Sequence, residues 1–137
     1  MDTIKIFVYG TLKIGGLFSD EFNKFRLDVK PAILNEYLMF DFGKFPGIVH
    51  SKGSISKVYG ELHTYSEPKN VLELMDYIEG YYPDNKGASL FLRKPVKVLS
   101  EAEKVKAYTY VFASFSATRS FKLIKDGIWK KEDENMV

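Results

Sequence analysis

The chain has 137 residues, of which 45% are hydrophobic, so it is the size of one domain and can bury its own core. Its formal net charge is +2, and the scattered basic residues indicate no nucleic-acid-binding surface. The absence of cysteine excludes a disulfide scaffold and a thiol nucleophile, and two histidines, His50 and His63, are too few for a typical zinc site. No apolar run reaches the roughly 20 residues of a membrane span, and Asp2 argues against a signal peptide. We therefore expect a cytoplasmic protein that binds neither metal nor membrane.

Residues 4–9 alternate between two faces, with aliphatic residues at 4, 6 and 8 and aromatic residues at 7 and 9. This period of two predicts a strand that ends at Gly10. A strand that runs into glycine leaves backbone N–H groups without a sheet partner, and such groups can hold a carboxylate or an oxyanion. The candidate binding residues are Tyr9, Gly10, Thr11 and Leu12. A tight turn without a ligand is the alternative.

The next elements alternate between helix and strand patterns. Ser19, followed by two acids, predicts a short helix, and strand patterns follow at residues 31–42, 48–49 and 58–65. Gly60, in the middle of the last of these, indicates a bulge or a close backbone approach. The clearest helix begins after Ser66, predicted as its cap, and ends at Gly80.

Strand patterns return at residues 90–92, 96–99 and 105–112, and the last two predict a hairpin around a polar connection. The stretch up to Trp129 is expected to be helical or irregular, and the charged tail from Lys130 to be disordered. The sum is an α+β protein with a small mixed, curled or barrel-like sheet of about six strands and two or three short flanking helices. We expect one domain over residues 1–129 and a tail over residues 130–137.

Glu79 stands out because of its position on the clearest helix. At about 100° per residue, it falls inside the apolar arc, between Met75 and Leu72, whereas Asp76 falls with the other charges. A carboxylate on a core-facing stripe is partly desolvated, which raises its pKa toward the range of a general base. Two alternatives remain: the helix end frays and releases Glu79 to water, or Glu79 forms an ion pair with Arg93 or a lysine.

Several short motifs occur together in one order. They are Y-G-T-L-K-x-G-G at residues 9–16, F-P-G-I-V at 45–49, Y-G-E-L at 59–62, M-D-Y-I-E-G-Y at 75–81, Y-T-Y-V at 108–111 and G-I-W at 127–129. In this combination, which covers nearly the whole chain, the sequence resembles the γ-glutamylcyclotransferase-like family, including the γ-glutamylamine cyclotransferases and the plant avirulence-induced proteins. Where the family often has an asparagine after the glycine-rich loop, this chain has residues 17–19, Leu-Phe-Ser, a departure that bears on substrate choice.

The resemblance implies an acyltransferase-type enzyme without a cofactor. Its partner would be a small γ-glutamyl amine or peptide, which is cyclised to 5-oxoproline with release of the amine. By resemblance, Glu79 is the general base and acid, and residues 9–12 hold the developing oxyanion or the α-carboxylate. Tyr110 would form a wall of the pocket with a usable hydroxyl, although an aromatic residue packed in a strand is the alternative. Loops at residues 17–25 and 81–87 would form the leaving-group pocket.

Two further interpretations remain open from the sequence. A protein of the same fold could bind an amino-acid-like ligand without catalysis, because fold and site can persist while chemistry changes. An interaction barrel without a ligand pocket would instead have a filled interior and Glu79 in solvent. A cavity that joins residues 10–12 to the Glu79 carboxylate distinguishes the last interpretation from the others. Neither histidine is assigned a role.

Overall fold

The computed structural model describes residues 2–114 and 116–130, and within them it contains eight strands, one α-helix and three 3₁₀ turns. The strands are β1 (Thr3–Val8), β2 (Arg26–Asn35), β3 (Tyr37–Asp41), β4 (Pro46–His50), β5 (Lys57–Ser66), β6 (Phe91–Ser100), β7 (Glu103–Phe112) and β8 (Lys122–Ile124). The helix is α1 (Pro68–Glu79), and the 3₁₀ turns are η1 (Ser19–Phe22), η2 (Lys86–Ala88) and η3 (Ser116–Ser120).

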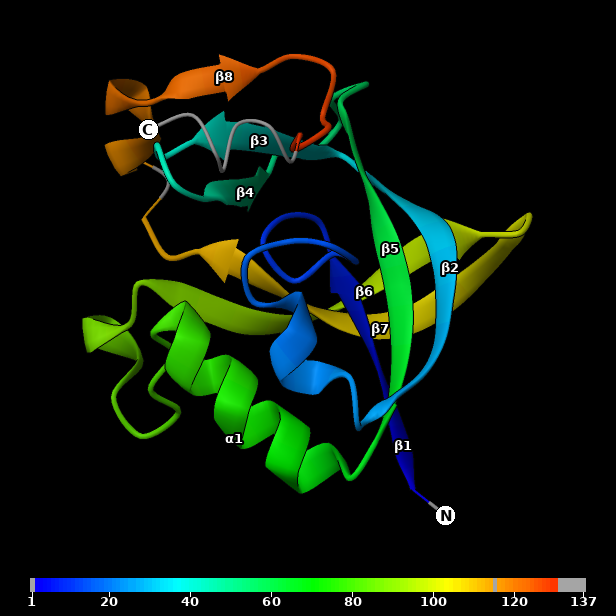
Figure 1. Cartoon of the computed structure of the whole chain (residues 1–137). Helices are drawn as coiled ribbons and strands as arrows, with labels where there is room; N and C mark the ends of the chain where they lie inside the picture. Colours follow the sequence, from blue (N-terminus) through cyan, green and yellow to red (C-terminus); the bar gives the residue numbers. More distant parts are fainter. Residues whose placement is uncertain (1, 115, 131–137) are drawn as a thin grey trace.

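The strands form two sheets. Five close into a barrel in the order β1-β5-β2-β6-β7, and the other three form a sheet in the order β4-β3-β8. Helix α1 lies on one side of the barrel, and the three-stranded sheet lies on the opposite side, at the top of the view (Figure 1). The predicted α+β class with a barrel-like mixed sheet is therefore confirmed, with two strands more than expected.

Strand β1 closes the barrel because it pairs along both edges. It runs antiparallel to β5 over its whole length and parallel to β7, where Ile6 lies opposite Tyr108. Phe7 and Tyr9 belong to a core shared with the three-stranded sheet, whereas Ile6 and Val8 belong to a second core shared with α1. The predicted alternation of β1 is confirmed, and it makes this strand the boundary between the two cores.

Gly60 of β5 lies against β1. A Cβ at this position would clash with the backbone of Val8 and the ring of Phe7. The one register shift in the β2–β5 pairing lies elsewhere, between Arg26 and Asp28. Gly60 therefore serves a close approach of two backbones and not a bulge, which decides between the two predicted roles.

The predicted strand at residues 31–42 is two strands in two different sheets. Glu36 separates them with a φ of 66°, in the left-handed region, and its backbone bonds to Ser51 and Ser56. Strand β2 consequently stays in the barrel while β3 leaves it to pair with β4 and β8. Strand β8 lies in a stretch that was expected to be helical or irregular, and its three residues are too few to show a period of two.

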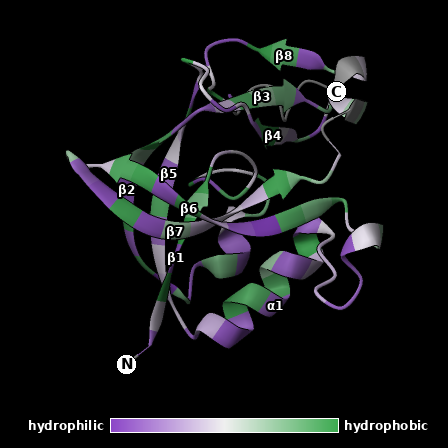
Figure 2. Cartoon of the chain, turned by 180° about the vertical axis from the view of Figure 1, so that it is seen from behind, coloured by the Kyte–Doolittle hydropathy of each residue, from purple (hydrophilic) through white to green (hydrophobic). Residues whose placement is uncertain are grey.

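Strands β6 and β7 form the predicted hairpin. Glu101 and Ala102 connect them with φ values of 51° and 66°, as a two-residue turn with both central residues left-handed requires. The register is regular from Phe91 opposite Phe112 to Ser100 opposite Glu103. Hydrophilic and hydrophobic residues alternate along these barrel strands (Figure 2).

Helix α1 begins and ends differently from a simple capped helix. Its N-cap is Glu67, left-handed at φ 50° and without a side-chain cap, so the predicted Ser66 cap is wrong. Ser66 instead bonds through its N–H and its hydroxyl to the Phe25 carbonyl. The predicted end at Gly80 is confirmed, because Gly80 adopts φ 67° and closes the last turn.

The predicted helix at Ser19 is only the 3₁₀ turn η1, whose N-cap is Phe18 and not Ser19. Within the described residues, no helix has the length and apolar character that a membrane crossing requires. The predicted disordered tail lies outside the described residues beyond Lys130.

Candidate active site

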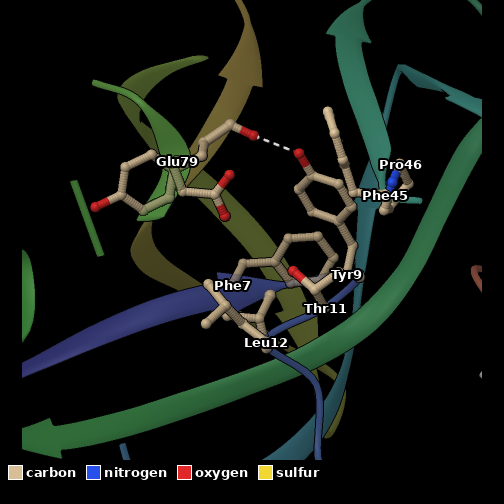
Figure 3. A pocket seen from close by; sticks show the side chains of 10 residues that line it. Phe7, Tyr9, Thr11, Leu12, Phe45, Pro46 and Glu79 are labelled. Atoms are coloured by element: carbon tan, nitrogen blue, oxygen red, sulfur yellow. Dashed lines mark hydrogen bonds between the residues drawn. The ribbon is translucent and has the colours of Figure 1, made fainter. Parts of the chain in front are cut away.

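Four segments of the chain meet around a small cavity. They are the end of β1 with the loop that follows, the start of β4, the last residue of α1 and the C-terminal part of β7. The cavity has a volume of about 30 Å³ and is lined by Phe7, Val8, Tyr9, Gly10, Thr11, Leu12, Phe45, Pro46, Glu79 and Tyr110. All six predicted site residues are therefore brought to one place, although they are spread over a hundred positions of sequence (Figure 3).

The loop after β1 is a tight turn held against β4. Lys13 donates its backbone N–H to the Gly10 carbonyl at 3.0 Å, so Thr11 and Leu12 are the central residues of the turn. A Cβ on Gly10 would lie 2.5 Å from Pro46 Cγ, so only glycine lets the two segments approach this closely. Within residues 2–114 and 116–130, the N–H groups of residues 10–12 find no hydrogen-bond acceptor. Three consecutive free donors are thus available to an anionic group in the cavity.

Glu79 is the last residue of α1, and its carboxylate points toward the residues at the end of β1 (Figure 3). No residue in the described part of the chain donates a hydrogen bond to this carboxylate or forms an ion pair with it. Burial raises the pKa of Glu79 to about 7. At neutral pH the group is consequently divided between acid and carboxylate, which suits it to accept and return a proton.

The two alternatives for Glu79 do not hold in the structure. The helix does not fray before Glu79, because Gly80 caps it in a left-handed conformation and Leu90 donates its backbone N–H to the Gly80 carbonyl. Arg93 pairs with Asp76 and not with Glu79. The interpretation as an interaction barrel also fails, because it requires Glu79 in solvent and no cavity beside it.

Asp76 is the centre of a polar cluster that the sequence pattern did not indicate. Arg93 Nη1 lies 2.6 Å from both carboxylate oxygens of Asp76, and the Tyr110 hydroxyl donates to Asp76 Oδ1 at 2.6 Å. The guanidinium also lies over the ring of Tyr81, 5.3 Å from its centroid. The helical period predicts Asp76 on the side of α1 that carries the other charges, but Asp76 is largely buried, with 13% of its side chain exposed.

Tyr110 lines the cavity, but its hydroxyl is engaged elsewhere. Burial first, and then the hydrogen bond to the Asp76 carboxylate, raises the pKa of Tyr110. The hydroxyl therefore stays protonated and is directed to Asp76 and not to a ligand. The usable hydroxyl expected at this position is not available in this arrangement.

Tyr9 ties the cavity to β7. Its hydroxyl donates to the Tyr110 carbonyl at 2.7 Å, and its side chain is almost fully buried. Burial raises the pKa of Tyr9 well above its usual value, and the nearby Glu79 charge raises it further. Tyr9 is thus a fixed, neutral wall of the site, which holds the end of β1 next to β7.

A second polar network holds the loop after the cavity. The Ile14 N–H donates to Glu61 Oε1 at 2.9 Å, and the same oxygen lies 2.9 Å from His63 Nε2. His63 Nδ1 lies 2.6 Å from the Tyr65 hydroxyl and accepts from Arg26 Nε at 3.3 Å. Because Arg26 can only donate, His63 Nδ1 is the acceptor in that bond, and His63 Nε2 donates its N–H to Glu61. His63, which had no predicted role, is therefore a structural link.

Burial would raise the pKa of Glu61, but the hydrogen bonds from His63 and Ile14 outweigh it and hold the pKa below its usual value. Glu61 is therefore a permanent anchor for the loop at neutral pH, unlike Glu79. In the described part of the chain, no three His, Asp or Glu side chains gather in a way that would hold a metal ion.

The chain is similar in fold to several proteins of known structure. The Bacillus subtilis protein YkqA is similar to it with a TM-score of 0.69 and 20% identity, over 93% of this chain and 40% of that one. The Arabidopsis thaliana protein At3g28950.1 is similar with a TM-score of 0.66 and 26% identity, over 98% of this chain and 74% of that one. An aig2-like protein from Mus musculus gives a TM-score of 0.67 and 18% identity, over 91% and 88% of the two chains.

The chain thus spans only two fifths of the Bacillus subtilis protein, which is considerably longer. No curated protein sequence matches the chain significantly. The family model described as "Gamma-glutamyl cyclotransferase, AIG2-like" matches residues 6–131, which include the whole cavity and the helix that carries Glu79. The chain therefore belongs to the γ-glutamyl cyclotransferase, AIG2-like family.

Proposed function

We propose that the protein is a γ-glutamyl cyclotransferase that converts a small γ-glutamyl amide or peptide into 5-oxoproline and a free amine. The observation that carries the proposal is the unpaired Glu79 carboxylate, with a pKa of about 7, in one cavity with the free N–H groups of residues 10–12. Membership of the family supports the same reaction class.

The reaction is balanced without water or a cofactor. The α-amine of the substrate attacks its own δ-carbonyl carbon, so a C–N bond forms within a five-membered ring, and the bond to the leaving nitrogen breaks. The α-ammonium first loses a proton to Glu79. Glu79 can act as a base here because burial raises the pKa of its carboxylate. Glu79 passes that proton to the leaving nitrogen. The ring nitrogen gives up a second proton as the C–N bond forms, and Glu79 accepts it and passes it to the released amine, which departs as an ammonium ion.

Charge develops on the carbonyl oxygen as the ring closes. The free N–H groups of residues 10–12 are fixed by the turn and by the contact between Gly10 and Pro46, so they need no reorganisation to stabilise an oxyanion. The same donors suit the substrate α-carboxylate. A γ-glutamyl chain bound between Glu79 and the N–H donors would also have few conformations. This restriction lowers the entropic cost of ring closure.

The cavity itself has room for only one or two water molecules. Substrate binding therefore requires the walls to move. Phe45 is suited to this, because it lies in the turn between β3 and β4, is only half-buried and lines a neighbouring cavity as well.

The test is a panel of γ-glutamyl compounds incubated with the wild type, Glu79→Gln and Glu73→Gln, with 5-oxoproline as the readout. Glu73 is the matched control, because it is an exposed carboxylate on the same helix. We expect Glu79→Gln to lower the rate by about 10²–10⁴-fold and Glu73→Gln to leave it unchanged. An active, folded Glu79→Gln would overturn the assignment of the base. Binding of γ-glutamyl compounds by the wild type without 5-oxoproline would favour a non-catalytic binding protein instead.

A further inference from the structure

A second cavity opens directly beside the first. It has a volume of about 240 Å³, near the lower end of the roughly 300–1,000 Å³ of small-molecule pockets. Three residues line both cavities, namely Thr11, Phe45 and Glu79. Glu79 therefore borders two compartments of different size, and residues 10–12, with the free N–H donors, all line the smaller one.

The larger cavity has an apolar wall. Six of its nine lining residues are large hydrophobic side chains: Leu17, Phe18, Phe45, Ile78, Leu90 and Phe91. Leu17 and Leu90 are 64% and 47% exposed, so this hydrophobic surface reaches the solvent. Exposed apolar side chains that gather beside a reactive carboxylate are characteristic of a ligand-binding cleft. Apart from Glu79, Lys44 is the one charged residue of the lining.

The two compartments suit the two ends of a γ-glutamyl compound. The γ-glutamyl end is charged and needs the N–H donors of residues 10–12, all of which line the smaller cavity, whereas only Thr11 of these also lines the larger one. The leaving nitrogen must reach Glu79 from the other side to recover its proton, and the larger cavity provides that approach. We propose that the amine released by this site carries a large apolar group, which the cleft of Leu17, Phe18, Ile78 and Leu90 binds. This inference rests on the proposed function.

The apolar group can belong to an amino acid or to a plain amine. Lys44 distinguishes the two sources, because it is exposed and no residue in the described ranges forms an ion pair with it. A leaving amino acid would place its carboxylate within the field of this ammonium, whereas an amine without a carboxylate would not use it. Leaving groups with a charged chain would have to be desolvated against the apolar wall, which is costly.

The first experiment compares kcat/KM for γ-glutamyl-phenylalanine, γ-glutamyl-phenethylamine, γ-glutamyl-alanine and γ-glutamyl-glutamate. We expect one or both of the aromatic compounds to exceed the alanine and glutamate compounds by roughly 10- to 200-fold, the range of discrimination that apolar pockets reach. Lys44→Met identifies the source. If Lys44→Met lowers kcat/KM for γ-glutamyl-phenylalanine alone, the leaving group is an amino acid. If both aromatic compounds react equally fast with the wild type and with Lys44→Met, the leaving group is a plain amine.

The second experiment changes the cleft. Leu17→Ser and Leu90→Ser alter exposed side chains, so the fold should tolerate both. We expect them to lower kcat/KM for the aromatic compounds about tenfold and to change that for γ-glutamyl-alanine much less. Leu27→Ser is the matched control, because Leu27 is 57% exposed and lies outside both cavities.

The outcomes separate the inference from the function on which it rests. Formation of 5-oxoproline from γ-glutamyl-alanine or γ-glutamyl-glutamate at least as fast as from the aromatic compounds would overturn the apolar leaving group and leave the cyclotransferase intact. Equal effects of Leu17→Ser and Leu27→Ser would overturn the cleft as its binding site. No 5-oxoproline from any compound would overturn the proposed function and the inference together.

Discussion

Asp76 and Glu79, two carboxylates three positions apart on α1, have different hydrogen-bond partners. Asp76 receives hydrogen bonds from Arg93 and Tyr110, whereas Glu79 receives none from any described residue. Both are held out of bulk water, so burial alone does not distinguish them. Their partners do, because Asp76 is held by the Arg93 guanidinium and the Tyr110 hydroxyl, whereas no described residue offers Glu79 a hydrogen bond or an opposite charge. The helix thus carries a paired acid and an acid without a described partner within one turn.

The largest effect should follow from removing the paired acid. Asp76→Asn leaves the Arg93 guanidinium, which is 21% exposed, without its counter-charge. We expect the free energy of unfolding to fall by roughly 2–4 kcal/mol, somewhat less than for a fully buried pair. Urea unfolding followed by circular dichroism measures it, with the exposed Glu73→Gln as the control. A loss no larger than that of the control would mean that Asp76 is not structural.

The unpaired acid should behave in the opposite way. Glu79 has a pKa of about 7 in the folded chain against an ordinary value of 4.5, so the folded state binds more protons between these values. Stability of the wild type therefore falls as the pH rises from 4.5 to 7. We expect Glu79→Gln to be more stable than the wild type at pH 8, by at most about 3 kcal/mol, and to lose this advantage below pH 4.5. Urea unfolding of both proteins across this range tests it, and a less stable variant at pH 8 would contradict it.

The activity should follow the charge state of the same group. If Glu79 is the base, kcat/KM rises with pH as the carboxylate forms, with a midpoint near 7. The deprotonated fraction, and with it the rate, grows about tenfold between pH 6 and pH 8. Initial rates of 5-oxoproline formation across this range measure it. A rise confined to higher pH would assign the limb to the substrate ammonium and not to Glu79.

The smallest effect should come from removing the Tyr110 hydroxyl, which links β7 to Asp76 on α1. Tyr110→Phe removes one of the hydrogen bonds to Asp76 but leaves the Arg93 pair in place. We expect a loss of about 1 kcal/mol in unfolding free energy and little change in KM, because the hydroxyl is directed to Asp76. Urea unfolding and steady-state kinetics of the same preparation test both. A large rise in KM with unchanged stability would show that the hydroxyl contacts the substrate after all.

Local patterns predicted the parts of the site that depend on a single element. The alternation of β1 placed residues 7 and 9 on one face, and the helical period placed Glu79 among apolar residues. Both signals arise because a strand or helix presents one face to a core. Hydrophobic residues then recur in the sequence with the period of that element. Gly60 was informative for a similar reason, since only a missing Cβ allows that approach.

Features that depend on distant partners could not be read in this way. The pairing of Asp76 with Arg93 and Tyr110 joins three elements, and no period links them. The register that sets Arg93 opposite Tyr110 is fixed by a two-residue turn at Glu101 and Ala102, and neither residue type marks a left-handed turn in a sequence. The left-handed Glu36, which divides β2 from β3, gave no signal, because glutamate rarely adopts that conformation.

The packing of α1 has a consequence for the stability of the site at high temperature. Leu12, in the turn that follows β1, belongs to the same core as Val71 and Met75 of α1. The distance between Glu79 and the N–H donors of residues 10–12 therefore depends on how firmly α1 packs in this one core, whereas Phe7 and Tyr9 of the same segment are also held in the other core. Local loosening of α1 would separate Glu79 from the donors while the barrel is still folded, so we expect the site to be lost at a lower temperature than the fold.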